Sequence, residues 1–149
     1  MPEPDVRRAT LADLDDLAAL FDAYRVFYEK PSDPEGARAF LKARIAGEES
    51  TLFLATLGGE PVGFTQLYPG FSSVSLAPIQ VLNDLYVREG ARRGGVAKAL
   101  LVAAIEYARV EGSVRLVLST ARSNVPAQAL YERYGWARDE DYLTYEYTL

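Results

Sequence analysis

The strongest constraint on the fold of this chain lies at residues 79–111, where a strand pattern runs through a glycine-rich turn directly into a helix pattern. Apolar residues at 79–87 predict the strand, and helical spacing predicts the helix at 96–111. The turn between them contains Gly94 and Gly95. A helix start carries backbone N–H groups without an internal partner and the positive end of the helix dipole. The segment therefore predicts an anion site.

The side chains of this turn suit a phosphate. Gly94 and Gly95 have no side chain that would block a ligand, and Ala97 keeps the surface low. Positive charge is supplied by Arg92, Arg93 and Lys98. The spacing fits neither the Walker A loop nor the GxGxxG dinucleotide turn. On this segment alone, a helix entry with surface arginines and no ligand is an alternative interpretation.

The rest of the sequence predicts alternating strands and helices. Strands are predicted at residues 5–9, 51–57, 61–68, 79–87, 114–119 and 142–149, and helices at residues 10–27, 33–47, 96–111 and 124–134. Residues 69–77 predict a turn-rich connection. The order β-α-α-β-β-β-α-β-α-β predicts an α/β fold with a mixed central sheet, in a single domain over residues 1–149.

The chain has 149 residues, and none of them is cysteine or histidine. This composition excludes thiolate nucleophiles, Ser–His and Cys–His pairs, and nearly all transition-metal sites. A general base must then be a carboxylate, a tyrosine, a lysine or a relayed water. We expect no metal and no covalent cysteine intermediate.

Charge and hydropathy narrow the possible partners. The formal net charge of −5 and the pI of about 4.8 argue against general affinity for nucleic acid. No stretch approaches the roughly 20 apolar residues of a membrane span. Residues 1–5 lack the basic and apolar regions of a signal peptide. We therefore expect a cytoplasmic protein with no nucleic-acid and no membrane partner.

Two motifs resemble those of one enzyme family. Residues 92–97, Arg-Arg-Gly-Gly-Val-Ala, match the pattern Gln/Arg-x-x-Gly-x-Gly/Ala. Residues 124–136 match Asn-x-x-Ala-x-x-x-Tyr-x-x-x-Gly-Phe, with Trp136 in place of the Phe. In this order, the two patterns are those of the GNAT N-acetyltransferase superfamily, which the chain resembles from Val6 to Leu149.

The resemblance implies acetyl-CoA as co-substrate. Amides from Arg93 to Lys98 would hold the pyrophosphate, and a strand splayed from its neighbour would pair its backbone with the pantetheine arm. Tyr131 would be the general acid toward the departing thiolate. The residues assigned in this way to acetyl-CoA are Leu85, Tyr86, Val87, Arg92, Arg93, Gly94, Gly95, Val96, Ala97, Lys98, Asn124, Ala127 and Tyr131. Simple N-capping is an equal reading of Asn124, and core packing is the alternative for Tyr131.

Residues 82–87, Leu-Asn-Asp-Leu-Tyr-Val, resemble more weakly the Leu-Glu-Asp-Phe-Phe-Val strand of spermidine/spermine and fungal histone/polyamine acetyltransferases. The polyamine enzymes use that Glu as the base. Asn83 stands at its position here, and an amide is no general base. Strand alternation places Asn83 on the face of Leu85 and Val87, nearer the predicted cleft. Asp84, on the opposite face, becomes a candidate base only if a bulge redirects it.

Aromatic residues indicate the side on which an acceptor would bind. The candidates are Tyr24, Phe27, Tyr28, Tyr68 and Phe71, for which core and surface packing is an equal alternative. The last predicted strand carries tyrosines at 142, 145 and 147, which by family habit suggest a homodimer surface, whereas its alternating pattern alone indicates only a half-buried strand.

The predicted function is direct acetyl transfer to a primary amine, of a small molecule, an amino acid or a polyamine. Acetylation of a protein lysine or N-terminus is one alternative. A CoA-binding regulatory domain without turnover is another, because the usual carboxylate is absent at Asn83.

Overall fold

The computed structural model describes residues 2–149, which divide into two compact units, one ending at Leu118 and the other spanning Ser119–Leu149. Within the described residues, the first unit holds one sheet of five strands: β1 (Asp5–Arg8), β2 (Thr51–Leu57), β3 (Glu60–Ser72), β4 (Ala77–Val87) and β5 (Leu116–Val117). They lie in sequence order. The pairs from β1 to β4 are antiparallel, and β4 pairs with β5 in parallel. The predicted mixed sheet is therefore confirmed.

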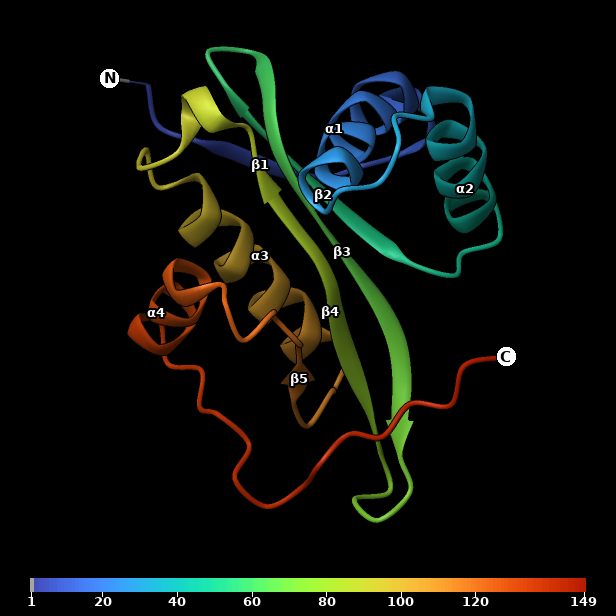
Figure 1. The fold of residues 1–149 in the computed structure, drawn as a ribbon, viewed down its shortest axis with the longest axis vertical. Coiled ribbons are helices and arrows are strands. Elements are labelled where there is room, and N and C mark those ends of the chain that lie inside the picture. The colour runs from blue at the N-terminus through green and yellow to red at the C-terminus, as the bar shows by residue number, and fades with distance from the viewer. Residues whose placement is uncertain (1) are drawn as a thin grey trace. The chain divides into compact units, whose positions relative to one another are not determined.

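Three helices pack on this sheet: α1 (Leu14–Phe27), α2 (Pro34–Ala46) and α3 (Val96–Val110). Figure 1 shows α1 and α2 on one face of the sheet and α3 on the other. A fourth helix, α4 (Val125–Arg133), belongs to the second unit. The predicted order of helices and the α/β fold class are confirmed.

The helices covering the first face begin where the sequence places caps. A 3-10 turn, η1 (Leu11–Asp13), leads into α1. Thr10 Oγ1 accepts from the Ala12 N–H at 3.3 Å, and Asp13 Oδ2 accepts from the Thr10 N–H at 2.9 Å, which completes a capping box. Asp33 Oδ1 caps α2 by accepting from the Gly36 N–H at 3.0 Å.

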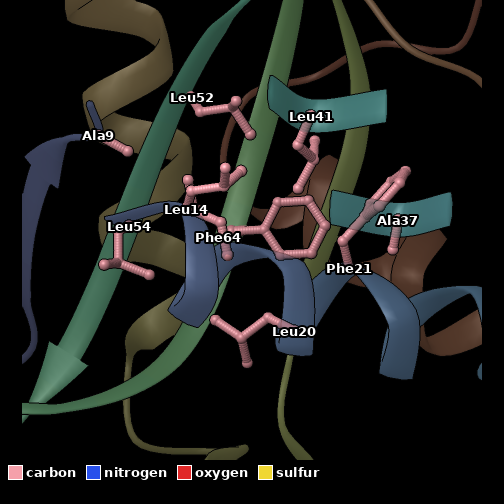
Figure 2. Packing of buried hydrophobic residues seen from close by; sticks show 10 residues of the cluster. Ala9, Leu14, Leu20, Phe21, Ala37, Leu41, Leu52, Leu54 and Phe64 are labelled. Atoms are coloured by element: carbon pink, nitrogen blue, oxygen red, sulfur yellow. The ribbon is translucent and has the colours of Figure 1, made fainter. Parts of the chain in front are cut away.

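The core between the sheet and α1–α2 centres on Phe64 of β3, which has no exposed surface. Figure 2 shows its ring among leucine and phenylalanine side chains of both helices and of β2. The ring of Phe21 meets it edge-on, with centroids 6.0 Å apart. Complete burial of one such side chain stabilises the fold by about 1.5–3 kcal/mol.

The opposite core joins α3 to the sheet and depends on a close approach at Gly63. Val96 and Leu100 of α3 pack there with Val62 and Val87. A Cβ at Gly63 would lie 2.8 Å from the backbone oxygen of Tyr86 and 3.3 Å from Cγ1 of Val96. Glycine at this position lets β3, β4 and α3 approach one another.

The hairpin between β3 and β4 is longer than predicted. The turn-rich connection expected at 69–77 is wrong over residues 69–72, which continue β3. Pro69 is tolerated in the strand because pairing with β2 ends at the Thr51–Leu67 pair, so Pro69 lies on a locally open edge of β3.

The C-terminal part of the chain differs most from the sequence prediction. The strand predicted at 114–119 contains only Leu116 and Val117, and the strand predicted at 142–149 is absent, with no strand assigned to those residues. Tyr142 and Tyr145 are 80% and 87% exposed. An alternating pattern forms a strand only where a neighbour supplies hydrogen bonds and a face to bury.

We expect Gly63→Ala to destabilise the fold by about 1–3 kcal/mol, because the added Cβ clashes with backbone that cannot move aside. Thermal unfolding should show a fall of about 2–4 °C for each kcal/mol lost. Gly90→Ala is the matched control, since a Cβ there meets nothing within 4 Å. An unchanged melting temperature for Gly63→Ala would contradict the close approach of β3 to β4 and α3.

Candidate active site

The strand β4 carries one extra residue where it pairs with β3. Gln66 pairs with Asp84 and Leu67 pairs with Leu82, so Asn83 between them has no partner in the register. Because side chains alternate with a period of two, one extra residue reverses the faces beyond it. The bulge that the sequence analysis required for Asp84 is therefore present. The simple alternation from which Asn83 was expected to face the cleft breaks at this point.

The bulge also fixes where the backbone of Leu85 and Val87 points. Asp84 O accepts a hydrogen bond from Thr65 Oγ1 of β3 at 2.8 Å, and the Arg88 N–H donates to a β3 carbonyl at 2.8 Å. Backbone groups of successive residues point to opposite edges of a strand. Leu85 and Val87 thus direct their N–H and C=O groups to the edge of β4 that faces away from β3.

That edge of β4 is paired with β5 over only two residues. The ladder joins Gln80 to Leu116 and Val81 to Val117. Beyond Val81, no strand among residues 2–149 pairs with this edge. An open backbone edge of this kind can accept an extended ligand as an added strand.

The predicted anion loop follows β4 through a 3-10 turn, η2 (Glu89–Ala91). Arg93 has φ 68° and Gly95 has φ 79°, so two residues of the loop are left-handed. Gly95 adopts this conformation without steric cost and is the N-cap of α3, with no side-chain capping bond. The helix ladder starts with the Ala99 N–H donating to Gly95 O at 3.0 Å. The start of α3 is thus an uncapped helix end, as an anion site requires.

Arg92 contacts other groups of the protein, although its charge predicted a role in binding an anion. Its Nε donates to Val87 O at 2.9 Å. Its guanidinium carbon lies 5.4 Å from the ring centre of Phe27 and 5.9 Å from that of Tyr86. These distances are in the range of cation–π contacts. Arg92 therefore links the loop to the end of α1, whereas Arg93 is exposed beside the helix start.

Asp84 is a carboxylate buried on the face of the sheet that α1 covers. It is 6% exposed. Its Oδ2 accepts from Nε2 of Gln66 at 2.8 Å, and its Oδ1 accepts from Nδ2 of Asn83 at 3.2 Å. Tyr24 of α1 is a third hydrogen-bonding partner. The bulge has turned this side chain into a polar cluster inside an apolar layer.

Burial raises the pKa of Asp84 above its ordinary value, because the charged carboxylate loses water. Hydrogen bonds from its three partners lower the pKa, but burial is the larger effect. The pKa of the neighbouring Tyr68 is also raised, first by burial and then by the negative charge of Asp84, with Arg44 opposing. A buried acid with a raised pKa is a recognised mark of proton-transfer sites.

The structure brings most of the predicted acceptor-side aromatics together at the end of α1. The ring centres of Tyr24 and Tyr28 are 5.1 Å apart, and those of Phe27 and Tyr28 are 5.4 Å apart. Tyr86 lies 6.0 Å from Tyr24. Phe71, by contrast, is 83% exposed near the hairpin tip.

Asn124, Ala127 and Tyr131 belong to the second unit. Asn124 Oδ1 accepts from the Ala127 N–H at 3.2 Å, so the N-capping reading of Asn124 is confirmed. Tyr131 lies in α4, with its ring centre 6.0 Å from that of Trp136. The parts that these residues would take in binding acetyl-CoA and in catalysis stay predictions.

Two polar residues in the hydrogen-bonded cluster around Asp84, Gln66 and Ser50, were not predicted from the sequence. Gln66 has no exposed surface, and its Oε1 accepts from Ser50 Oγ at 2.8 Å. The available signal was a glutamine inside the apolar strand pattern of residues 61–68, where a polar side chain requires a partner.

Neither a metal site nor a membrane span is found in the part of the chain that the structure describes. Residues 2–149 contain no group of three or more acidic side chains placed to hold a metal ion. Over the same residues, every helix is too short or too polar to cross a bilayer.

Comparison with known proteins shows the family of this chain. The model of the Acetyltransferase (GNAT) family matches residues 17–136, which include the anion loop, the bulged strand and α4. The chain belongs to the GNAT acetyltransferase family. Members of this family use acetyl-CoA as co-substrate. This GNAT protein is thus an N-acetyltransferase, as predicted.

Similar proteins cover the whole chain. The uncharacterized N-acetyltransferase YhfO of Bacillus subtilis (strain 168) is 45% identical over 141 residues, 95% of each chain. The aminoglycoside N(6')-acetyltransferase type 1 of Serratia marcescens is 30% identical over 143 residues, which are 93% of this chain and 97% of that protein. A crystal structure of a probable acetyltransferase, 44% identical, superposes with a TM-score of 0.92 over 97% of each chain. These likenesses support the family and not the polyamine/histone subgroup that residues 82–87 resemble.

We expect Asp84→Asn to be more stable than the native chain at neutral pH. The pKa of Asp84 is higher in the folded state than in the unfolded state. Its contribution to stability is therefore fully present below the unfolded pKa of about 3.9 and is lost as the pH rises through the folded pKa. The free energy of unfolding of the variant minus that of the native chain should rise as the pH passes the unfolded pKa and should level off above the folded pKa of Asp84.

Denaturant unfolding at a series of pH values measures this difference. Asp15→Asn is the control for loss of a surface carboxylate, because that side chain is 87% exposed. A difference between Asp84→Asn and the native chain that stays constant with pH would contradict the raised pKa.

Proposed function

We propose that this GNAT enzyme transfers the acetyl group of acetyl-CoA directly to a primary amine of a small molecule, with Asp84 as general base. One observation carries the proposal. Because of the bulge at Asn83, the buried carboxylate of Asp84 points toward the aromatic cluster. On the same strand, the backbone groups of Leu85 point to the open edge of β4. Base and donor-binding edge thus lie on consecutive residues of β4.

The chemistry requires a base of this kind. A primary ammonium has a pKa near 10.4, so the amine is mostly protonated at neutral pH. Asp84 accepts the proton of the ammonium, directly or through one water, and the freed nitrogen lone pair attacks the thioester carbonyl. A pKa raised by burial makes the carboxylate a stronger base, and the loss of water beside this buried group disfavours the charged ammonium.

The donor is held by backbone groups. The open edge of β4 at Leu85 and at the Val87 N–H suits the amides of the pantetheine arm, since the Val87 carbonyl is occupied by Arg92. An N–H on this edge suits the oxyanion. The uncapped start of α3, after Gly94 and Gly95, suits the pyrophosphate. The tetrahedral intermediate collapses with cleavage of its C–S bond, and the CoA thiolate takes a proton from the hydroxyl of Tyr131. The second proton lost by the amine nitrogen returns through water to the tyrosinate.

The acceptor side supports a compact amine over a polyamine. Tyr24 hydrogen-bonds to Asp84 and Tyr68 interacts with its charge, and Phe27 and Tyr28 extend the aromatic cluster from Tyr24. The other buried carboxylate among the described residues, Asp13, is paired with Arg7, so Asp84 is the one beside these rings. A polyamine carries several ammonium groups that would need more carboxylates. The relative from Serratia marcescens is named for an aminoglycoside acceptor, which supports a small molecule over a protein lysine.

Two further features stay predictions. The exposed tyrosines of residues 142–149, including Tyr142, Tyr145 and Tyr147, offer an edge for pairing with a second copy, as a homodimer would need. The expected cytoplasmic location likewise rests on the sequence.

The first test is an acetyltransfer assay that follows thiol release from acetyl-CoA. The acceptor panel holds aminoglycosides, amino acids, polyamines and lysine peptides. We expect turnover with a compact amine and a fall in kcat/KM of about 10²–10⁴-fold in Asp84→Asn, the range that a general base contributes. Tyr131→Phe should lower kcat with little change in the Kd for acetyl-CoA.

Asp15→Asn, at a carboxylate of α1 that is 87% exposed, serves as the control and should keep native activity. Turnover with peptides alone would replace the proposal by protein acetylation. Tight acetyl-CoA binding with no acceptor-dependent release would leave a CoA-binding regulatory domain.

A second test separates donor binding from folding. In Gly94→Ala the new Cβ makes only an ordinary contact, 3.4 Å from Ala91 O, so the melting temperature should stay within about 2 °C of native. The same methyl group projects where the pyrophosphate would approach the backbone. We expect the Kd for CoA, measured by calorimetry, to rise at least about tenfold, or about 1.4 kcal/mol. Unchanged affinity would move the phosphate site away from this loop.

A further inference from the structure

Gln66 is the best-buried polar side chain beside Asp84, and the proposed reaction gives it no part. It has no exposed surface, and both ends of its amide are engaged. Nε2 donates to Asp84 Oδ2 at 2.8 Å, and Oε1 accepts from Ser50 Oγ at 2.8 Å. Ser50, Gln66 and Asp84 therefore form a continuous chain of hydrogen bonds.

The chain has a direction set by charge. An ionised carboxylate only accepts hydrogen bonds, so Gln66 must present its NH₂ group to Asp84. The Ser50 hydroxyl then donates to the free Oε1 and holds the amide in this orientation. Protonation of Asp84 would remove the requirement. The arrangement thus favours the ionised form of the carboxylate.

Few other charged or titratable groups face Asp84. Tyr24 from α1 is a hydrogen-bonding partner, and Tyr68 from β3 interacts with its charge. From α2, Arg44 acts on Tyr68 and lies in an ion pair with Glu49, whose side chain is 2.8 Å away. Gln66 is the donor with the shorter of the two amide contacts to the carboxylate, and it is the one that is fully buried.

We propose that Gln66 is a positioning residue for acetyl transfer, which, oriented by Ser50, keeps Asp84 ionised and fixed in place to accept the proton of the amine. The proposal rests on the proposed function, in which Asp84 is the base. It assigns a purpose to a fully buried amide, a polar group that is costly to bury unless it is hydrogen-bonded.

Ser50 is the accessible end of this chain. It lines a cavity of about 450 Å³, together with Arg8, Thr51, Leu52 and Tyr107 among others. Ser50 is only half-buried, so its substitution disturbs the core less than substitution of Gln66. Ser50→Ala removes the hydroxyl that orients the amide, and Ser50→Thr keeps it.

The experiment measures kcat/KM against pH with one amine acceptor, so that ionisation of the acceptor is common to all variants. In Gln66→Leu the carboxylate loses a donor that favours its charged form, so the acid limb should move up by about one pH unit or more. Below the inflection this shift is an approximately tenfold loss, recovered at high pH. Ser50→Ala should shift less in the same direction, and Ser50→Thr should resemble the native enzyme.

Gln80→Leu is the matched control, because Gln80 is a buried glutamine, 5% exposed, on β4 that does not bond to Asp84. A uniform loss at all pH values in Gln66→Leu, with no shift of the acid limb, would overturn the proposal. If that variant does not fold, an unshifted acid limb in Ser50→Ala overturns it in the same way.

If Asp84 were not the base, the experiments would give a different result. Native kcat/KM in Asp84→Asn would remove Asp84 from the mechanism. The pH dependence of unfolding still reports on Gln66 in that case. The first comparison is the difference in the free energy of unfolding between Gln66→Leu and the double variant Gln66→Leu/Asp84→Asn. This difference should reach its plateau at a higher pH than the corresponding difference between the native chain and Asp84→Asn. A plateau at the same pH would overturn the action of Gln66 on the carboxylate.

Discussion

The extra residue in β4 is the constraint on which the rest of the site depends. Because Asn83 has no partner in the β3 ladder, everything beyond it in β4 is turned over. The carboxylate of Asp84 enters the core beneath α1, and the backbone of Leu85 faces the edge that β5 leaves open. Without the bulge, Asp84 would lie on the other face of the sheet, away from Tyr24 and Gln66. A single register change therefore places the proposed base next to the proposed donor-binding edge.

The anion loop depends on a second local constraint, which is backbone conformation. Two left-handed residues, Arg93 and Gly95, bring the chain from η2 into the start of α3. Glycine supplies this geometry freely, whereas a non-glycine residue such as Arg93 adopts it with some strain. Strained residues of this kind are commonly found where backbone must meet a ligand. The loop is thereby set in shape before any ligand arrives.

Local sequence signals predicted most of the fold. The sequence was sufficient to predict the helix caps at Thr10 and Asp33, the helical spacing of α1 to α4 and the apolar strands. Each of these features depends on neighbours within a few residues. The strand expected at 142–149 failed because strand formation needs a partner that the pattern alone does not reveal. The bulge was foreseen only as a condition. An unpaired residue is a property of two strands together, so the sequence of β4 alone does not contain it.

The buried charge of Asp84 also has a consequence for how this enzyme would respond to artificial evolution. Removing that charge should relieve the desolvation that raises its pKa. A screen for heat resistance that ignores turnover would therefore favour chains that have given up the carboxylate. Because Asp84 is also the base that we propose, stability and turnover must be selected together in a library from this scaffold.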